Sequence, residues 1–209
     1  MHIHYISLFP TIFQNFEQTS IVAKAVERGL LSFSQYNPRD NTSDWFVDDT
    51  IYWWGVGMLI QAEPVIKSIE QALLSVQEGE TYLIVFPSPS EVVFNQSTAL
   101  QWSSYDHLMF INGRYEGIDH RVQLRCEREH PDHFVRISLG SFVLLGGEVA
   151  SMTMTEAVVR LIPDVIKESA SRQQESYSPL QGMKNIEKPH YTRPPSVRWL
   201  DVPDNVLQK

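Results

Sequence analysis

Short, almost uniformly apolar runs recur along the chain and predict buried β-strands. The clearest are Tyr82–Phe86, His107–Ile111 and Phe134–Ile137. Continuous apolar runs of this length are typical of parallel sheets, whose strands are covered on both faces. Two further runs, His2–Phe9 and Leu31–Tyr36, are rich in β-branched and aromatic residues and also predict strands.

Between these runs, apolar residues repeat at the spacing of one helix face. Residues 65–76 and 154–161 each predict a helix, and residues 11–28 predict another that Gly29 ends. Residues 41–61 show no clean period and are interpreted as a loop. The alternation of strands and helices predicts an α/β fold with a mainly parallel sheet flanked by helices.

Composition limits the class of protein further. A chain of 209 residues with 43% hydrophobic and 20% charged residues is typical of a globular protein. No apolar run is long enough to cross a bilayer, and no signal peptide is recognisable at the amino terminus. Cys126 is the single cysteine, which excludes an intramolecular disulfide and a zinc site built from cysteines. We therefore expect a cytoplasmic protein.

The charge is unevenly distributed. The net charge of −8 argues against a non-specific nucleic-acid binder, although a selective RNA enzyme is still possible because local charge decides contact. Residues 169–209 carry more basic than acidic side chains and five of the twelve prolines. This composition predicts an extended, linker-like tail without a core of its own.

Five of the ten glycines fall between residues 113 and 147, each near a junction of strand and loop. In open α/β sheets, ligands bind beyond the carboxyl ends of the strands, so this clustering predicts a ligand pocket. Any one of these glycines is equally compatible with an ordinary tight turn. The spacing matches neither the dinucleotide-binding nor the triphosphate-binding glycine motif, which removes the main support for those ligands.

Several motifs then carry a resemblance to one known family. The longest are GRYEGID at 113–119, SLGSFVLLGGE at 138–148 and PHYTRP at 189–194, and shorter matches lie at 7–10, 37–40, 47–49 and 57–59. In this order along almost the whole chain, they resemble the bacterial TrmD family, the tRNA (guanine-37-N1)-methyltransferases.

The resemblance implies a SPOUT-type fold with a deep trefoil knot that binds S-adenosylmethionine. It implies methyl transfer to N1 of the guanine 3′ of the anticodon in tRNA, by a homodimer whose active site lies at the subunit interface, with Mg²⁺ as a further requirement. Residues 1–168 would form the cofactor-binding and catalytic domain. Residues 169–209 would be the interdomain linker and a truncated remnant of the tRNA-binding domain. Neither DNA nor a membrane is an expected partner.

Three loops would hold the cofactor by this resemblance. The expected cofactor-binding residues are Phe86, Pro87, Ser88, Gly113, Tyr115, Glu116, Gly117, Ser138, Leu139, Gly140, Ser141, Phe142, Val143, Leu144, Leu145, Gly146 and Gly147. The leucines among them are also compatible with plain core packing. Glu116 matches a family acid near the sulfonium, but it could equally be a turn residue that pairs with Arg114.

Two residues would carry the chemistry. N1 of guanine bears a proton that a base must remove as the methyl group arrives. The family's carboxylate for this step corresponds to Glu175, where the family has Asp; a solvated surface charge is the alternative interpretation. Arg160 corresponds to the arginine that stabilises the charge growing on O6. Alternatively, its stem covers the flank of a helix.

The expected RNA-binding residues are Asp49, Tyr52, Gly57, Met58 and Arg114. Beside them, Trp53 and Trp54 replace two glycines of the family's pattern and could stack on an RNA base.

No metal ligands are assigned. His130 and His133 lie three residues apart, but Pro131 separates them and no third ligand is evident. Two alternative functions stay open: a methyltransferase of the same class that acts on another RNA, and a cofactor-binding relative without useful catalysis.

Overall fold

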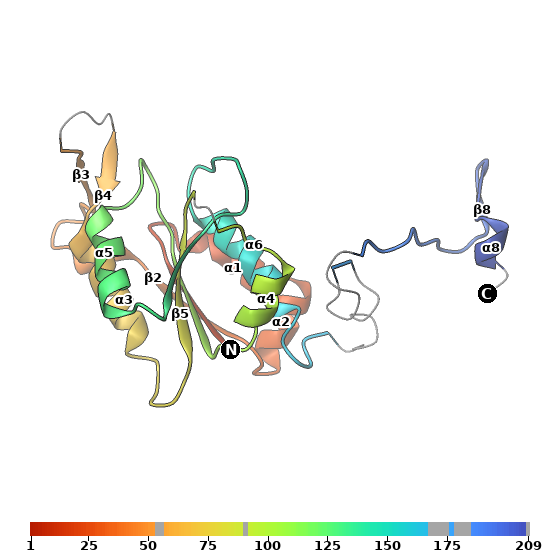
Figure 1. Ribbon diagram of the computed structural model, residues 1–209, viewed down its shortest axis with the longest axis horizontal. Coiled ribbons are helices and arrows are strands. Elements are labelled where there is room, and N and C mark those ends of the chain that lie inside the picture. Colours follow the sequence, from red (N-terminus) through yellow and green to blue (C-terminus); the bar gives the residue numbers. More distant parts are fainter. Residues whose placement is uncertain (53–56, 90–91, 167–175, 178–184, 208–209) are drawn as a thin grey trace. The chain divides into compact units, whose positions relative to one another are not determined.

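A computed structural model describes residues 1–52, 57–89, 92–166, 176–177 and 185–207. The chain divides into two compact units, Met1–Lys167 and Glu168–Lys209. The first unit is an α/β domain (Figure 1) and contains both of the cavities described below.

A five-stranded, fully parallel sheet forms the centre of the first unit. Its strands, in spatial order, are β2 (Ser32–Tyr36), β1 (His2–Ile6), β6 (His107–Ile111), β5 (Tyr82–Pro87) and β7 (Phe134–Ile137). The α/β fold with a parallel sheet, predicted from the apolar runs, is confirmed. The deep trefoil knot stays a prediction.

Helices cover both faces of this sheet (Figure 1). One face carries α1 (Thr11–Glu17), α2 (Ser20–Glu27), α4 (Gln96–Trp102) and α6 (Glu148–Val159). The other face carries α3 (Ala62–Leu73) and α5 (His120–Glu129). Side chains alternate across each strand, so the sheet supplies two separate hydrophobic cores, one under each helix layer. The short helices α4 and α5 were not predicted.

Two predicted elements differ from the structure. The single helix expected over residues 11–28 is broken between α1 and α2, because Ser20 has a left-handed φ of 50° that a continuous helix cannot contain. The loop expected over residues 41–61 is wrong in part, since β3 (Asp48–Thr50) and β4 (Met58–Ile60) pair there as an antiparallel hairpin. These strands are three residues long, too short to show a period.

The amino ends of β1 and β6 bring three imidazole rings together. The ring centroids of His2 and His4 lie 4.0 Å apart, and those of His4 and His107 lie 5.2 Å apart. Burial, with a smaller contribution from the neighbouring His2 and His107, lowers the pKa of His4 to about 3. The His4 ring is therefore neutral at neutral pH.

The second unit contains a two-residue pairing of β8 (Ser196–Val197) with β9 (Leu200–Asp201) and the one-turn helix α8 (Asp204–Leu207). None of its described residues is buried. This agrees with the expectation that the tail has no core, whereas the domain boundary and the remnant of a tRNA-binding domain stay predictions. Among the described helices, none combines the length and the apolar character that a membrane crossing requires.

Candidate functional site

Three loops that follow neighbouring strands enclose a cavity of about 420 Å³. They leave the carboxyl ends of β5, β6 and β7, which all point to the same edge of the parallel sheet. Figure 1 shows the loops after β6 and β7 rising from that edge. The cavity thus lies where the glycine clustering predicted a ligand pocket.

The cavity gathers almost all of the predicted cofactor-binding residues. Every one of them lines it except Ser141, which is exposed on the loop after β7. Side chains that the sequence analysis did not assign also line the wall: His120, Gln123 and Arg136. His120 and Gln123 come from α5, an element that was not predicted, so no sequence signal pointed to them. Ligand binding at this wall stays a prediction.

The loop after β7 is stabilised by its own short hydrogen bonds. The Ser138 hydroxyl donates to the carbonyl of Gly140 at 2.9 Å, and the amide of Gly140 donates back to that hydroxyl at 3.1 Å. Beyond this turn the side chains of Phe142, Val143 and Leu145 are exposed, Leu145 by 90%. A row of exposed apolar side chains at the mouth of a cavity indicates a surface that contacts a ligand or another chain.

A buried ion pair lies next to the cavity, since one of its two members, Arg114, lines the cavity. Glu148, the first residue of α6, is fully buried, and its Oε2 lies 2.9 Å from Nε of Arg114. The Nε–H does not point at this oxygen, so the contact is an ion pair without a directed hydrogen bond. The Ser7 hydroxyl donates to Oε1 of the same carboxylate at 2.7 Å. Arg114 therefore pairs with Glu148, and the alternative pairing with Glu116 is wrong.

Gly146 is required by this ion pair. A Cβ at that position would lie 2.6 Å from Nε of Arg114 and 2.7 Å from Oε2 of Glu148. Real Cβ atoms essentially never approach that closely, so any other residue would push the two charged groups apart. The glycine that the sequence analysis assigned to the cofactor is thus also needed for the close packing of two loops.

The hairpin β3–β4 is joined to the cavity by backbone hydrogen bonds. The amide of Ile60 donates to the carbonyl of Gly117 at 3.0 Å, and the amide of Glu116 donates to the carbonyl of Met58 at 3.1 Å. Gly57 has a φ of 103°, and a Cβ there would lie 2.5 Å from Cγ of Glu116. Two of the predicted RNA-binding residues, Gly57 and Met58, therefore lie beside a predicted cofactor residue.

The other predicted RNA-binding positions face solvent or the ion pair. Asp49 lies on β3 opposite Leu59, and Tyr52 is 89% exposed. Arg114 is partly committed to Glu148. Trp53 and Trp54 lie outside the described residues.

A second arginine, Arg39, lies close to the cavity wall. Its Nη2 donates to the Tyr115 hydroxyl at 3.4 Å, and its Nη1 donates to the Leu8 carbonyl at 3.0 Å. The guanidinium groups of Arg39 and Arg114 lie 5.7 Å and 5.0 Å from the centroid of the Phe9 ring. Arg39 gives local positive charge beside the wall in a chain whose net charge is −8, whereas the charge of Arg114 is compensated by Glu148.

Acidic groups at the wall are few. Asp119 caps α5, and the hydrogen bonds from the Arg121 side chain hold the pKa of its carboxyl below the usual value. Glu116 is the other acid that lines the cavity. An anionic Glu116 suits a ligand with a positive charge.

The two predicted catalytic residues do not meet in the described structure. Arg160 follows the last residue of α6 and lines a second cavity of about 440 Å³, together with residues of α1 and α2. It does not line the first cavity. Glu175 lies outside the described residues.

Known proteins resemble this chain along its full length. A profile of the family described as tRNA (Guanine-1)-methyltransferase TrmD matches residues 1–209. A tRNA (guanine-N(1)-)-methyltransferase from Streptococcus uberis is 42% identical over 99% of this chain and 80% of its own length. The enzyme of the same name from Carboxydothermus hydrogenoformans is 39% identical over 99% and 77%.

A solved structure is also similar. The crystal structure of tRNA (m1G37) methyltransferase from Aquifex aeolicus superposes with a TM-score of 0.79 at 26% identity, covering 99% of this chain and 82% of that one.

Proposed function

The chain belongs to the tRNA (guanine-1)-methyltransferase TrmD family, and we propose that it methylates N1 of guanine 37 in tRNA with its three cavity loops as the cofactor site. The enzyme class is that of an S-adenosylmethionine-dependent tRNA (guanine-N1)-methyltransferase. We propose that the protein is cytoplasmic, because its proposed substrate, tRNA, is found in the cytoplasm.

The observation that carries this proposal is the cavity at the carboxyl ends of β5, β6 and β7. Its volume of about 420 Å³ falls within the range of pockets that bury small molecules. Its wall combines the apolar side chains Leu139 and Leu144 with the carboxylate of Glu116. These residues fit a donor with an apolar part and a positive sulfur centre. S-adenosylmethionine supplies a methyl group activated by that positive sulfur.

The chain's own residues would perform the remaining steps. A carboxylate must remove the N1 proton of guanine as the methyl group is transferred, and we propose Glu175 for this role on the resemblance. Negative charge then grows on O6, which a guanidinium can stabilise through its fixed pair of donors, and we propose Arg160 for this role. If the loops exclude water, the contact of Glu175 with N1 and that of Arg160 with O6 would both be stronger.

Two features support a homodimer in which the partner completes the site. Arg160 lines a different cavity from the proposed cofactor residues, so one subunit's Arg160 would act at the partner's cofactor cavity. The exposed apolar side chains Val143 and Leu145 at the cavity mouth would be covered by the partner. Twofold symmetry would form two such sites per dimer.

Mg²⁺ is proposed as a further requirement of the reaction. This ion takes oxygen ligands and commonly keeps water or substrate oxygens in its shell. Of the two acids among the described cavity residues, Asp119 is engaged by Arg121, and Glu116 is proposed to face the positive sulfur. Most ligands of the ion would therefore come from substrate and water.

The direct test is methyl transfer to tRNA transcripts that differ only at position 37. We expect a transcript with guanine there to yield 1-methylguanosine, identified by mass after digestion, and a transcript with adenine there to yield none. The variant Gly140→Arg fills the cavity, so it should abolish both transfer and cofactor binding by calorimetry.

The other outcomes separate the alternatives. Methylation of a different RNA or nucleoside would contradict the proposed substrate while keeping the enzyme class. Cofactor binding without transfer to any RNA would indicate a relative without useful catalysis.

A further inference from the structure

The three imidazoles at the amino ends of β1 and β6 form a second cluster of chemically competent side chains. One ring nitrogen from each of His2, His4 and His107 lies within 4.8 Å of the other two. His4 and His107 are buried, and His2 is half-buried. Within the described part of the chain, no other three His, Cys, Asp or Glu side chains converge in this way.

Register explains why these residues meet. His2 and His4 alternate onto one face of β1, and His2 is the direct cross-strand partner of His107 on β6. The proposed cofactor loops leave the opposite, carboxyl ends of the strands. The histidines therefore cannot contact substrate at that cavity, and methyl transfer does not explain them.

The hydrogen bonds of the cluster place a single proton between a nitrogen of His4 and a nitrogen of His107. Nε2 of His107 lies 3.0 Å from Oε2 of Glu80, so this nitrogen carries the proton that the carboxylate accepts. Nδ1 of His107 then presents a lone pair to Nε2 of His4 at 2.9 Å. A carboxylate that fixes the far nitrogen of an imidazole is the usual support of a metal-binding histidine.

We propose that His2, His4 and His107 bind one Zn²⁺ ion, which takes the place of the proton between His4 and His107. That proton moves to Nδ1 of His4, which faces the Tyr36 hydroxyl. Imidazole nitrogens suit zinc, which binds them at about 2.0–2.1 Å, so tetrahedral geometry separates two such nitrogens by about 3.3 Å. The 2.9 Å gap between His4 and His107 has to widen by only a few tenths of an ångström.

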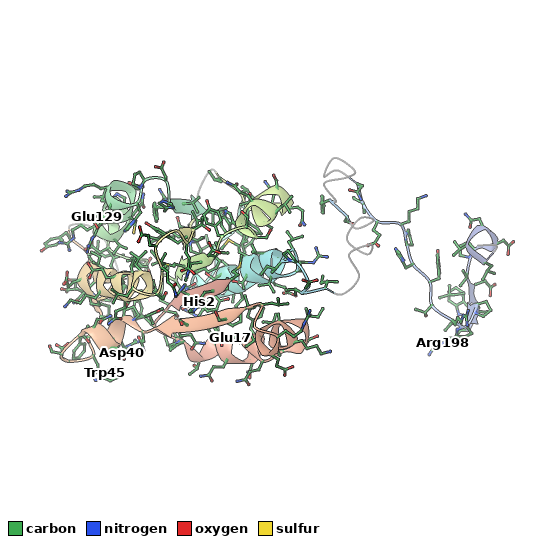
Figure 2. All side chains as sticks on the ribbon, turned by 90° about the horizontal axis from the view of Figure 1, so that it is seen from below. His2, Glu17, Asp40, Trp45, Glu129 and Arg198 are labelled. Carbon is green, nitrogen blue, oxygen red and sulfur yellow. The ribbon has the colours of Figure 1, made fainter. Side chains whose placement is uncertain are left out.

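The largest movement falls on His2, and the structure permits it. Its Nε2 is held by the Ser34 hydroxyl at 2.8 Å, an interaction that water can replace at this partly open edge. His2 is the first residue of β1 (Figure 2). Three histidines leave the fourth position to water. The bound ion would connect the amino ends of two central strands.

Zinc titration of tag-free, chelator-stripped full-length protein tests the site. We expect calorimetry to give one Zn²⁺ per chain, with little net proton release in buffers of different ionisation enthalpy, because each neutral imidazole keeps its proton on the nitrogen that does not bind the ion. Co²⁺ as a probe should give the intense visible absorption of four-coordinate cobalt. Because an ion that binds only the folded state stabilises it, zinc should also raise Tm.

Matched variants identify the ligands. His2→Gln at the open edge should fold normally and weaken zinc binding at least tenfold, and His107→Asn should do the same. The double variant His130→Asn, His133→Asn serves as a control, because it removes two histidines that lie three residues apart and outside the proposed site. It should bind zinc as the parent does. Absence of stoichiometric zinc binding would overturn the site, and so would parent-like binding by His2→Gln that has a parent-like circular dichroism spectrum.

Discussion

The side chain of Arg114 forms an ion pair with the fully buried carboxylate of Glu148, with 2.9 Å between Nε and Oε2. This contact joins the loop after β6 to the first turn of α6, and Ser7 after β1 donates to the same carboxylate. Three segments distant in sequence thus meet next to the proposed cofactor cavity. The charge of Glu148 is compensated there by one guanidinium.

Removal of that guanidinium should destabilise the protein strongly. Arg114→Met leaves the Glu148 charge buried with a single hydroxyl donor, a situation that typically costs about 3 kcal/mol. Urea unfolding would measure the loss. The control Arg121→Met removes a guanidinium that is 72% exposed from its pair with the half-buried Asp119 and should change stability little.

A double variant distinguishes the ion pair from simple loss of packing. Arg114→Met combined with Glu148→Gln removes both charges, so it should lose less stability than the two single variants added together. Strict additivity would show that the two side chains do not interact.

The glycine beside the ion pair should tolerate no side chain. Gly146→Ala introduces a Cβ less than 3 Å from both charged groups and should lower the free energy of unfolding by about 1–3 kcal/mol. In Gly113→Ala, by contrast, the new Cβ meets nothing closer than 3.6 Å. Comparison of the two variants by urea unfolding checks the contact; equal losses would contradict it.

The single cysteine should be inert in the folded protein. Burial raises the pKa of the Cys126 thiol to about 11, so at pH 8 the reactive thiolate is scarce. A thiol reagent should react slowly with native protein and rapidly in urea.

The same shift makes stability depend on pH. The unfolded thiol loses its proton near pH 9 while the folded thiol keeps it, so stability should fall as pH rises from about 9 to about 11. Cys126→Ala should lose this component of the pH dependence and keep the component from other groups.

The proposed base can be tested by isosteric substitution. Glu175→Gln should lower the single-turnover methyl-transfer rate about 10²–10⁴-fold and leave cofactor affinity nearly unchanged, because only proton abstraction is lost. Glu175→Asp keeps a carboxylate and should retain activity. A parent-like rate in Glu175→Gln would assign the base to another residue.

The proposed stabiliser of O6 has its own conservative test. Arg160→Lys keeps the charge but cannot reproduce the fixed fork of donors, so the transfer rate should fall. The same single-turnover assay at saturating cofactor measures this effect. An unchanged rate would contradict the role of Arg160 at O6.

Subunit mixing tests whether the active site is shared. Gly140→Arg blocks the proposed cofactor cavity and Glu175→Gln lacks the proposed base, so each variant alone should be strongly impaired. If the base of one subunit serves the cavity of the other, a mixed dimer contains one complete site. Activity should then appear on mixing after subunit exchange. Continued inactivity in mixtures that contain mixed dimers would indicate that each chain supplies its own base.

The sequence was sufficient for features that depend on local pattern. Continuous apolar runs identified β5, β6 and β7, because strands covered on both faces have few polar residues, and runs rich in β-branched and aromatic residues identified β1 and β2. Glycines and motifs at the ends of three strands predicted which loops would surround the cavity. Parallel strands share one carboxyl edge, so this part of the site followed from the order of elements.

Local pattern failed where elements are short or polar. The strands β3 and β4 have three residues each, and α5 has so many charged residues that its apolar face was not recognised. In such segments, packing against the rest of the protein decides the conformation.

Only the tertiary structure decided which distant side chains meet. Arg114 pairs with Glu148 instead of Glu116, and His2 reaches His107, because strand register and the close approach at Gly146 bring these residues together. The composition of a sequence and the spacing of its apolar residues indicate which residues of a single helix or strand are buried. They do not specify the register between elements, and register is what sets the ion pair next to the cavity and the histidine cluster at the opposite edge of the sheet.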